Sequence, residues 1–229
     1  LVLLRDVSEL RRRDRLLLTK DATIAEIHHR VKNNLQTVSS LLRLQSRRVA
    51  SPDARAAILE SEQRIRSIAM VHEILSREAS DDAPFDEIVV SLARSLEDAV
   101  TSREHPVEIT VQGDPGALPS HMATSLAVAL AELLQNAIQH GRPAEGNPCV
   151  IEVHQDHDDD EVRFRIVDHG AGLPDGFDLS RDAGLGITIV QTLIRDDLGG
   201  SLLLEPIERG SGAVAIVTAP LPRRPASTV

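Results

Sequence analysis

The chain has 229 residues, of which 41% are apolar, so it is long enough for one large domain or two modest ones and is not disordered throughout. Its formal net charge of −10 argues against general electrostatic attachment to nucleic acid or to an anionic membrane. With three Phe and no Trp or Tyr, the core must consist of aliphatic side chains, and few rings remain on which bases could stack.

The sequence predicts a cytoplasmic protein. It contains no run of about 18 apolar residues, and its first residues are too few for a signal peptide. The single cysteine, Cys149, cannot form an internal disulfide, and we expect it to be a small residue at the start of a strand. Because the chain lacks an initiator Met and opens with a strand-like apolar run, we expect it to be a fragment whose upstream domain was removed.

The first element predicted in chain order is a long helix. Residues from about Ser8 to Val49 contain no Gly or Pro, and their apolar residues follow helical spacing. A seven-residue repeat on this helix, formed by Ile24, Val31 and Val38, requires a packing partner.

A second helix should begin at Ser51-Pro52 and run to about Glu78. Ser51 can cap the first turn, and Pro52 suits the first helical position. The short joint makes an antiparallel hairpin, and because one hairpin cannot cover both apolar seams, we expect two chains to form a four-helix bundle.

The polar stretch Ser80–Pro84 predicts a domain boundary, after which helices and strands alternate in an α/β layer. The expected helices are Asp86–Ser102, Ser120–His140 and Gly186–Asp197, and the expected strands are Val107–Gln112, Val150–Gln155, Glu161–Val167, Ser201–Glu205 and Ala213–Ala219. A hairpin turn is expected at Asp156–Asp160. The fold class is therefore α+β, a helical hairpin followed by an α/β sandwich.

Two adjacent histidines lie on the first helix. At about 100° per residue, His28 falls within roughly 40° of the apolar direction, whereas His29 lies about 140° away and faces out. Glu26 and Asn33 are three and four residues from His29, so all three share the exposed face. A neutral imidazole beside a carboxylate and an amide is a reactive arrangement, although a plain solvated helix face explains the same pattern. A metal site at the two histidines is disfavoured because adjacent helical residues diverge.

A carboxylate and an amide recur on a later helix. Glu132 and Asn136 are four residues apart, so they share one face and can hold Mg²⁺ directly or through water, with phosphate oxygens as further ligands. The same spacing also occurs in helices where it is purely structural.

Two glycine clusters follow. Asp168 ends a predicted strand before Gly170 and Gly172, where a buried carboxylate can accept a hydrogen bond from an exocyclic amine such as that of adenine; a plain turn is the alternative. Gly184-Leu185-Gly186 opens a helix whose free amides can meet phosphate oxygens. The charged segment Leu173–Ala183 between them is predicted to be a mobile lid, or else an ordinary surface loop.

These clusters resemble the kinase core of two-component sensor histidine kinases, in the subgroup whose phosphoacceptor motif reads His-Arg-x-Lys-Asn (the HisKA_2 type, related to the HWE kinases), and are especially similar to soluble actinobacterial members. The resemblance covers residues from about 20 to 220. It implies the end of a PAS-like sensor domain and a signalling helix in residues 1–20, a dimerisation and histidine phosphotransfer domain in 21–80, and a GHKL-type catalytic ATP-binding domain in 81–225.

By the same resemblance, His29 is the phosphoacceptor, and Asn33 occupies the place linked to phosphotransfer and dephosphorylation. Glu132, Asn136 and His140 match the N box, with His140 as a phosphate contact. Asp168, Gly170 and Gly172 match the G1 box. The G2 box is matched by Gly184, Leu185 and Gly186. The implied cofactors are ATP and Mg²⁺, held by Asn136 with Glu132.

Two departures from the wider family leave the general base open. Common kinases have an acid directly after the phosphoacceptor, where this chain has Arg30, so Glu26 is the base or there is no strong base. The lid is short and no phenylalanine-rich box is evident.

The resemblance implies a homodimer and a response regulator as partners, and it suggests a regulator of the RNA-binding antiterminator type. Direct nucleic-acid binding and a membrane span are not expected. The alternatives are a GHKL ATPase that phosphorylates no histidine and a non-catalytic dimeric scaffold. The hairpin tip that contains His154, His157 and Asp156–Asp160 could bind a metal ion, but we favour a charged, solvent-exposed tip. The stimulus, the identity of the regulator, any phosphatase activity and transfer within or between chains are not readable from the sequence.

Overall fold

A computed structural model describes residues 30–31, 33–75, 82–102, 106–141, 148–207 and 211–222. The chain divides into two compact units, Leu1–Ala79 and Ser80–Val229. None of the helices in the described part of the chain combines the length and apolar character that a membrane span requires.

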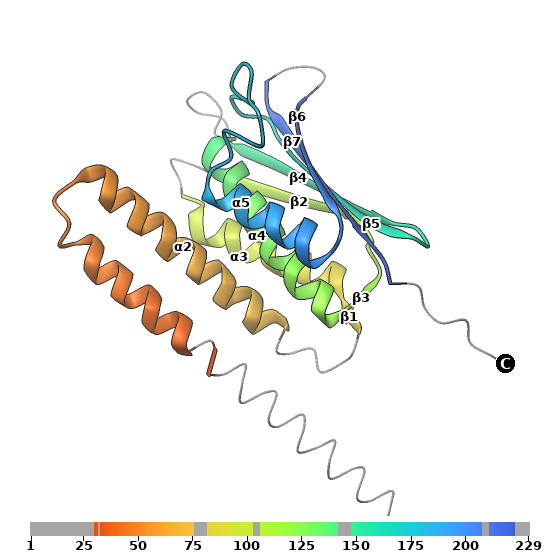
Figure 1. Cartoon of the computed structure of the whole chain (residues 1–229), viewed down its shortest axis with the longest axis horizontal. Helices are drawn as coiled ribbons and strands as arrows, with labels where there is room; N and C mark the ends of the chain where they lie inside the picture. The colour runs from red at the N-terminus through yellow and green to blue at the C-terminus, as the bar shows by residue number, and fades with distance from the viewer. Residues whose placement is uncertain are drawn as a thin grey trace, which may run out of the picture. The chain divides into compact units, whose positions relative to one another are not determined.

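The first unit is a helical hairpin (Figure 1). Residues 33–46 are helical, and after a turn at 47–48 the helix α2 spans Pro52–Leu75. The first helix thus ends three residues before the predicted Val49. The predicted cap is confirmed, because the Ala54 amide donates to Ser51 Oγ at 3.4 Å. His28, His29 and Glu26 lie outside the described residues, as does the predicted helix before residue 30.

A buried carboxylate joins the two helices of the hairpin. Glu62 of α2 accepts hydrogen bonds from Ser39 Oγ at 2.7 Å and from Arg66 at 2.5 Å, and Arg43 lies 3.5 Å away. Burial alone would raise the pKa of Glu62, but the hydrogen bonds from Ser39 and Arg66 outweigh it and lower the pKa. Glu62 is therefore held in its charged form.

The second unit is built on a five-stranded mixed sheet of order β2-β4-β5-β7-β6. The strands are β2 (Val107–Gly113), β4 (Cys149–His157), β5 (Glu161–Asp168), β6 (Ser201–Pro206) and β7 (Ala213–Pro220). Only β2 and β4 pair in parallel, as the crossover through α4 requires. The predicted strands are confirmed, each to within one or two residues.

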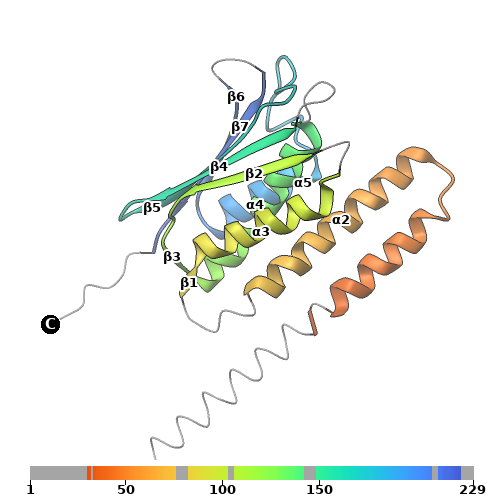
Figure 2. The same cartoon turned by 180° about the vertical axis from the view of Figure 1, so that it is seen from behind.

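Three helices cover one face of this sheet (Figures 1 and 2). They are α3 (Phe85–Val100), α4 (Ser120–His140) and α5 (Leu185–Thr192). Alternate residues of β4 and β5 point inward, and Phe85 and Phe164 meet edge to face at 5.4 Å with neither ring exposed. The opposite sheet face carries the polar residues.

Three details differ from the sequence-based expectations. Asp82–Pro84, predicted as part of a polar break, forms a short strand β1 that pairs with β3 (Ala117–Pro119). Because β4 extends to His157, only residues 158–160 remain for the predicted turn at Asp156–Asp160. The helix predicted to run to Asp197 becomes a π-helical turn, η1, over Leu193–Asp197.

Candidate functional site

The C-terminal half of α4 carries three of the predicted site residues. Glu132 is buried, Asn136 is half-buried and His140 is exposed. The Nδ2 atom of Asn136 is buried without a hydrogen-bond partner in the described residues, and so is Nε2 of the neighbouring Gln135. A buried polar atom without a partner is costly, so this stretch of α4 suits an added ligand with polar atoms. Gln135 was not singled out in the sequence.

Asp168 is the last residue of β5, as predicted, and its turn is built on glycine. Its Oδ1 accepts a hydrogen bond from the Gly170 amide at 3.0 Å. The sequence predicted a buried carboxylate, but the residue is only half-buried, so part of it remains accessible. Gly172 has φ +79°, a conformation that other residues rarely adopt, which confirms a need for glycine there.

The end of α4 and the turn after β5 meet at two glycines. A Cβ added to Gly170 would lie 2.3 Å from Gly141 Cα, and one added to Gly141 would lie 2.8 Å from Asp168 Cβ. Only glycine allows this approach. Because Gly141 directly follows α4, the contact brings the part of the helix that carries Asn136 close to Asp168.

A third segment, before β7, closes on the same turn. Ser211 Oγ donates to the Gly170 carbonyl oxygen, and a Cβ on Gly212 would lie 2.1 Å from the carbonyl oxygen of Asp168. Gly141, Ser211 and Gly212 were not predicted as site residues. Their only sequence signal was a glycine beside a predicted helix end or strand start, which many ordinary turns share.

The second glycine cluster opens α5. Gly184 is the N-terminal flanking residue of that helix, and its carbonyl oxygen accepts from the Thr188 amide at 3.0 Å. No side chain in the described residues caps the first turn, so its amides remain available to an anion. Leu185 is 60% exposed and Gly186 is buried. Since α5 packs against α4, this cluster lies in the same helical layer as Asn136.

The predicted lid has internal hydrogen bonds. Asp178 Oδ1 accepts from the Ser180 amide at 2.8 Å and from Ser180 Oγ at 2.6 Å, and the Asp178 amide donates to Asp182 Oδ2 at 2.9 Å. The hydrogen bonds from Ser180 lower the pKa of Asp178. Arg181 donates to Asp182 at 3.0 Å, and this hydrogen bond is the main cause that lowers the pKa of Asp182. The segment is a small loop bonded to itself, and its closure over a ligand stays a prediction.

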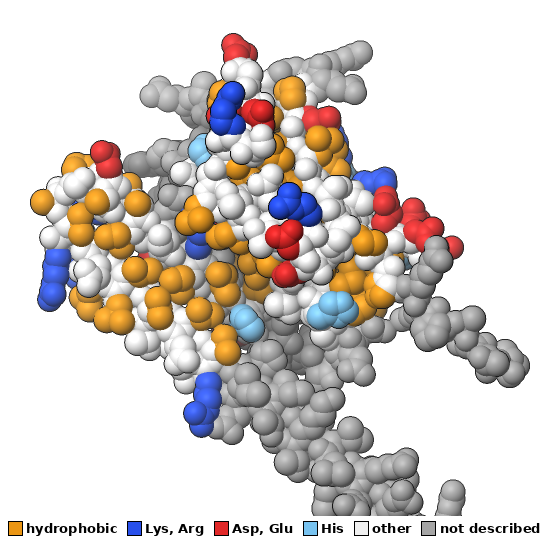
Figure 3. Space-filling view, in the orientation of Figure 1, with side chains coloured by type: hydrophobic (Ala, Val, Ile, Leu, Met, Phe, Trp, Pro, Cys, Tyr) orange, Lys and Arg blue, Asp and Glu red, His pale blue; other side chains and the backbone are white. Residues whose placement is uncertain are grey.

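The described part of the hairpin includes one predicted site residue, Asn33, which is exposed; its carbonyl oxygen accepts from Thr37 Oγ1 at 2.9 Å. His29 and Glu26 lie outside the described residues. Figure 3 shows hydrophobic side chains gathered along the hairpin, and its large exposed apolar residues are Val38, Leu41, Leu44 and Leu59. An apolar surface of this kind is typical of an interface.

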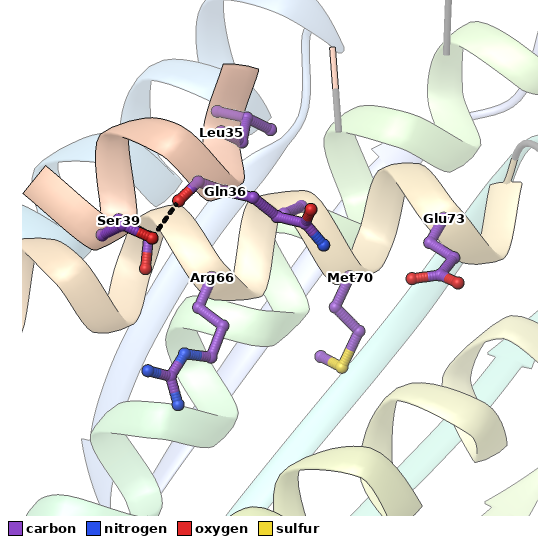
Figure 4. A pocket seen from close by; sticks show the side chains of 8 residues that line it. Leu35, Gln36, Ser39, Arg66, Met70 and Glu73 are labelled. Atoms are coloured by element: carbon purple, nitrogen blue, oxygen red, sulfur yellow. Dashed lines mark hydrogen bonds between the residues drawn. The ribbon is translucent and has the colours of Figure 1, made fainter. Parts of the chain in front are cut away.

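A pocket opens between the two helices of the hairpin (Figure 4). Its lining comes from both helices and comprises Leu35, Gln36, Ser39, Ser40, Arg66, Ala69, Met70 and Glu73. Two of these residues, Ser39 and Arg66, also hold Glu62.

Metal binding finds no support around the β4–β5 hairpin. Within the described residues, no group of three or more His, Cys, Asp or Glu side chains is arranged to hold a metal ion. The ring of His157 instead lies against Gly116, and its Nδ1 is 3.0 Å from the Asp114 carbonyl oxygen. Cys149, at the start of β4 as predicted, is buried with Sγ 3.4 Å from the Gly141 carbonyl oxygen.

Comparison with known protein families gives two matches. Residues 26–100 match the histidine kinase family HisKA_2, and residues 122–223 match the histidine kinase-, DNA gyrase B- and HSP90-like ATPase family. The first match ends at Val100, the last residue of α3, and the second begins within α4 and extends past the end of β7.

The chain is similar to curated proteins along almost its whole length. It is 42% identical over 223 residues to the sensor histidine kinase PdtaS of Mycolicibacterium smegmatis and 43% identical over 224 residues to PdtaS of Mycobacterium tuberculosis. Each alignment covers 97% of this chain but 44% of the relative, so the chain spans less than half the length of these proteins.

Among solved structures, the histidine kinase domain of a blue-light-activated histidine kinase from Erythrobacter litoralis aligns with a TM-score of 0.59 at 24% identity. The alignment covers 88% of this chain and 94% of that domain, which supports the fold: a helical hairpin region followed by an α/β ATPase-like domain.

Proposed function

Because the chain belongs to the histidine kinase family, we propose that it transfers the γ-phosphoryl group of Mg-ATP to His29 and then to an aspartate of a response regulator. The observation that carries the proposal is the close approach of Gly141 and Gly170, which brings the Asn136 end of α4 beside Asp168. An amide for the metal and phosphates and a carboxylate for the base then line one site.

The residues of the second unit bind and orient the nucleotide. Asp168 keeps one side accessible and accepts a hydrogen bond from the exocyclic amine of adenine, while Gly172 lets the turn lie flat against the ring. Asn136 Nδ2, which has no hydrogen-bond partner in the described residues, would donate to a phosphate oxygen, and the Asn136 side-chain oxygen would hold Mg²⁺ together with Glu132, directly or through water. Gly184, Leu185 and Gly186 offer backbone amides to phosphate oxygens, and His140 contacts phosphate from the exposed end of α4.

The hairpin supplies the acceptor. A nitrogen of neutral His29 attacks the γ-phosphorus in line, the bond from that phosphorus to the bridging oxygen breaks, and ADP leaves. Glu26 is the proposed acceptor of the imidazole proton, and Asn33 is the amide that positions phosphate or water. Mg²⁺ held there would neutralise charge on the phosphates, and positioning by these residues would provide most of the acceleration.

We also propose that two chains pair through the apolar face that includes Leu41 and Leu44, and that a receiver domain docks on the resulting bundle. A regulator of the RNA-binding antiterminator type is the proposed partner. The reaction would take place in the cytoplasm, which agrees with a lone buried Cys149 that needs no oxidising compartment.

The test incubates the full chain and two variants, His29→Gln and Asp168→Asn, with γ-labelled Mg-ATP. We expect acid-labile, alkali-stable label on the parent, none on His29→Gln, and reduced label with weaker ATP binding on Asp168→Asn. ATP binding by His29→Gln should equal that of the parent.

Two outcomes would contradict the proposal. If the parent binds and hydrolyses ATP but carries no label, the chain is an ATPase of the related class. If neither the parent nor His29→Gln binds ATP, the second unit is a scaffold without a working nucleotide site.

A further inference from the structure

Three polar side chains meet on the sheet face that the helices do not cover. Glu152 Oε1 lies 2.9 Å from His169 Nε2, and Glu152 Oε2 lies 3.2 Å from His154 Nε2. Both distances are within hydrogen-bond range. Glu152 and His154 belong to β4, whereas His169 follows Asp168 directly and belongs to the turn after β5.

The strand register explains why these residues meet. Glu152 lies opposite Val167 in the antiparallel β4–β5 pair, so His169, two residues further along, is its diagonal neighbour on the same face. Side chains alternate along a strand, and Asp168 therefore points to the other face, where its Cβ would crowd any Cβ on Gly141. The His169 side chain thus contacts Glu152 on the open face of the sheet, whereas Asp168 points to the face that the helices cover.

Glu152 is suited to hold an imidazole in place. The hydrogen bond with His169 is the largest cause that lowers the pKa of Glu152; burial opposes it, and His154 lowers the pKa further. The carboxylate is consequently charged near neutral pH. Around it on the same face, Thr110 pairs with Glu152 and Glu108 lies two residues earlier on β2, while Arg165 pairs with His154 on β5.

The rest of the turn is held through its own backbone, by close backbone contacts and by one serine hydroxyl. Gly170 is fixed by Gly141 and by Ser211, and Gly172 by Gly212. Among the described residues of the turn, His169 makes a side-chain contact that reaches to another strand. It lies between Asp168 and Gly170, so a change in its contact acts on the residue directly next to Asp168.

We propose that His169 is a positioning residue for recognition of the nucleotide base, and that its bond to Glu152 holds the Asp168–Gly172 turn in the binding conformation. The inference rests on the proposed function, because it assumes that Asp168 accepts from the exocyclic amine of adenine. If the turn is already held in this conformation before the nucleotide binds, less conformational entropy is lost on binding, and the affinity is higher.

The side chains of His169 and Glu152 are 47% and 36% exposed, so their contact has the modest strength of a surface pair. Its loss should weaken ATP binding about two- to fivefold. Inosine triphosphate, which carries a carbonyl where adenine carries the amine, should be affected less, since it lacks the bond that the turn positions.

The experiment measures the dissociation constants of ATP and inosine triphosphate by calorimetry on the full chain. The variants are His169→Leu, Glu152→Leu, their combination, and His169→Gln, whose amide can still donate to Glu152. His154→Leu is the matched control, because it also removes a contact to Glu152 but lies on β4 outside the turn.

We expect both single leucine variants to lower the preference for ATP over inosine triphosphate to the same degree, with no further loss in the double variant. His169→Gln should recover the preference, and His154→Leu should retain it. Equal weakening of both nucleotides would reduce the contact to a general structural role and overturn the inference, as would unchanged binding by His169→Leu. If the unmodified chain does not bind ATP, the proposed function itself fails.

Discussion

Replacing Gly170 with alanine tests whether the contact between α4 and the β5 turn is as close as the structure has it. The added Cβ would lie 2.3 Å from Gly141 Cα, 2.5 Å from Gly141 C and 2.7 Å from the His140 carbonyl oxygen. All three neighbours are backbone atoms, so no side-chain rotation relieves the clash. Either the turn or the end of α4 must move.

The cost follows from that geometry. Overpacking in a well-packed region costs about 1–3 kcal/mol, and three backbone contacts favour the upper end. For a unit the size of Ser80–Val229, about 3 kcal/mol corresponds to a fall in melting temperature of roughly 6–12 °C. ATP affinity should fall as well, because the movement separates Asp168 from Asn136.

The assay is differential scanning calorimetry of the full chain without nucleotide, following the transition of the second unit. Gly184→Ala is the matched control: a Cβ there meets nothing within 4 Å, and its φ of −69° suits any residue. It should change stability by no more than about 1 kcal/mol. A Gly170→Ala variant as stable as Gly184→Ala would refute the close approach and with it the juxtaposition on which the proposed site depends.

Three other predictions concern the hairpin and the core. Because folding lowers the pKa of Glu62, its charge stabilises the hairpin above the ordinary carboxyl pKa of about 4.3, and this stabilisation is lost as the pH falls through the lower folded-state pKa. Glu62→Gln should therefore reduce the stability of the hairpin by about 1 kcal/mol at pH 7. It should also flatten the pH dependence of hairpin unfolding below pH 5, measured by circular dichroism. Changing Leu41 and Leu44, both more than half exposed, to glutamate should convert a dimer to single chains in light scattering, since burying two charges costs several kcal/mol. The control Gln36→Glu, which adds a charge at an exposed position about 140° around the helix from Leu41, should remain dimeric. Cys149, 3% exposed, should resist a thiol reagent in the folded chain and react at the rate of a free thiol in denaturant; rapid reaction in the folded chain would contradict its burial.

The order of helices and strands in the second unit was predictable because each element carries its own periodicity. α4 begins and ends at the predicted residues, with apolar residues at helical spacing and Gly141 just after its end. The strands β1 and β3 were not predictable, since each has three residues and pairs with a segment far away in sequence. Such a pairing leaves no repeating pattern in either segment.

The site was predictable in its residue types and not in its assembly. Asp168 and Asn136, which are proposed to contact the nucleotide and its metal ion, occur in recognisable clusters. Gly141 and Gly212 matter only because other backbones approach them, which depends on the tertiary fold and has no local signature. Asp168 is less buried than expected for the same reason: a strand-end position predicts the direction of a side chain and not how far the neighbouring loops cover it.

Because side chains alternate between the two faces of the sheet at the end of β5, the neighbouring residues Asp168 and His169 lie on opposite faces. Asp168 faces the helices and the proposed nucleotide site, whereas Val167 and His169 face the opposite side of the sheet, where His169 meets Glu152. A substitution at His169 would therefore loosen the turn that positions Asp168 without replacing any side chain that faces the proposed nucleotide site. On this geometry, affinity for the base and the chemistry of transfer can vary independently, and residues on the outer face of the sheet are the place to look for differences in nucleotide affinity between chains with identical binding motifs.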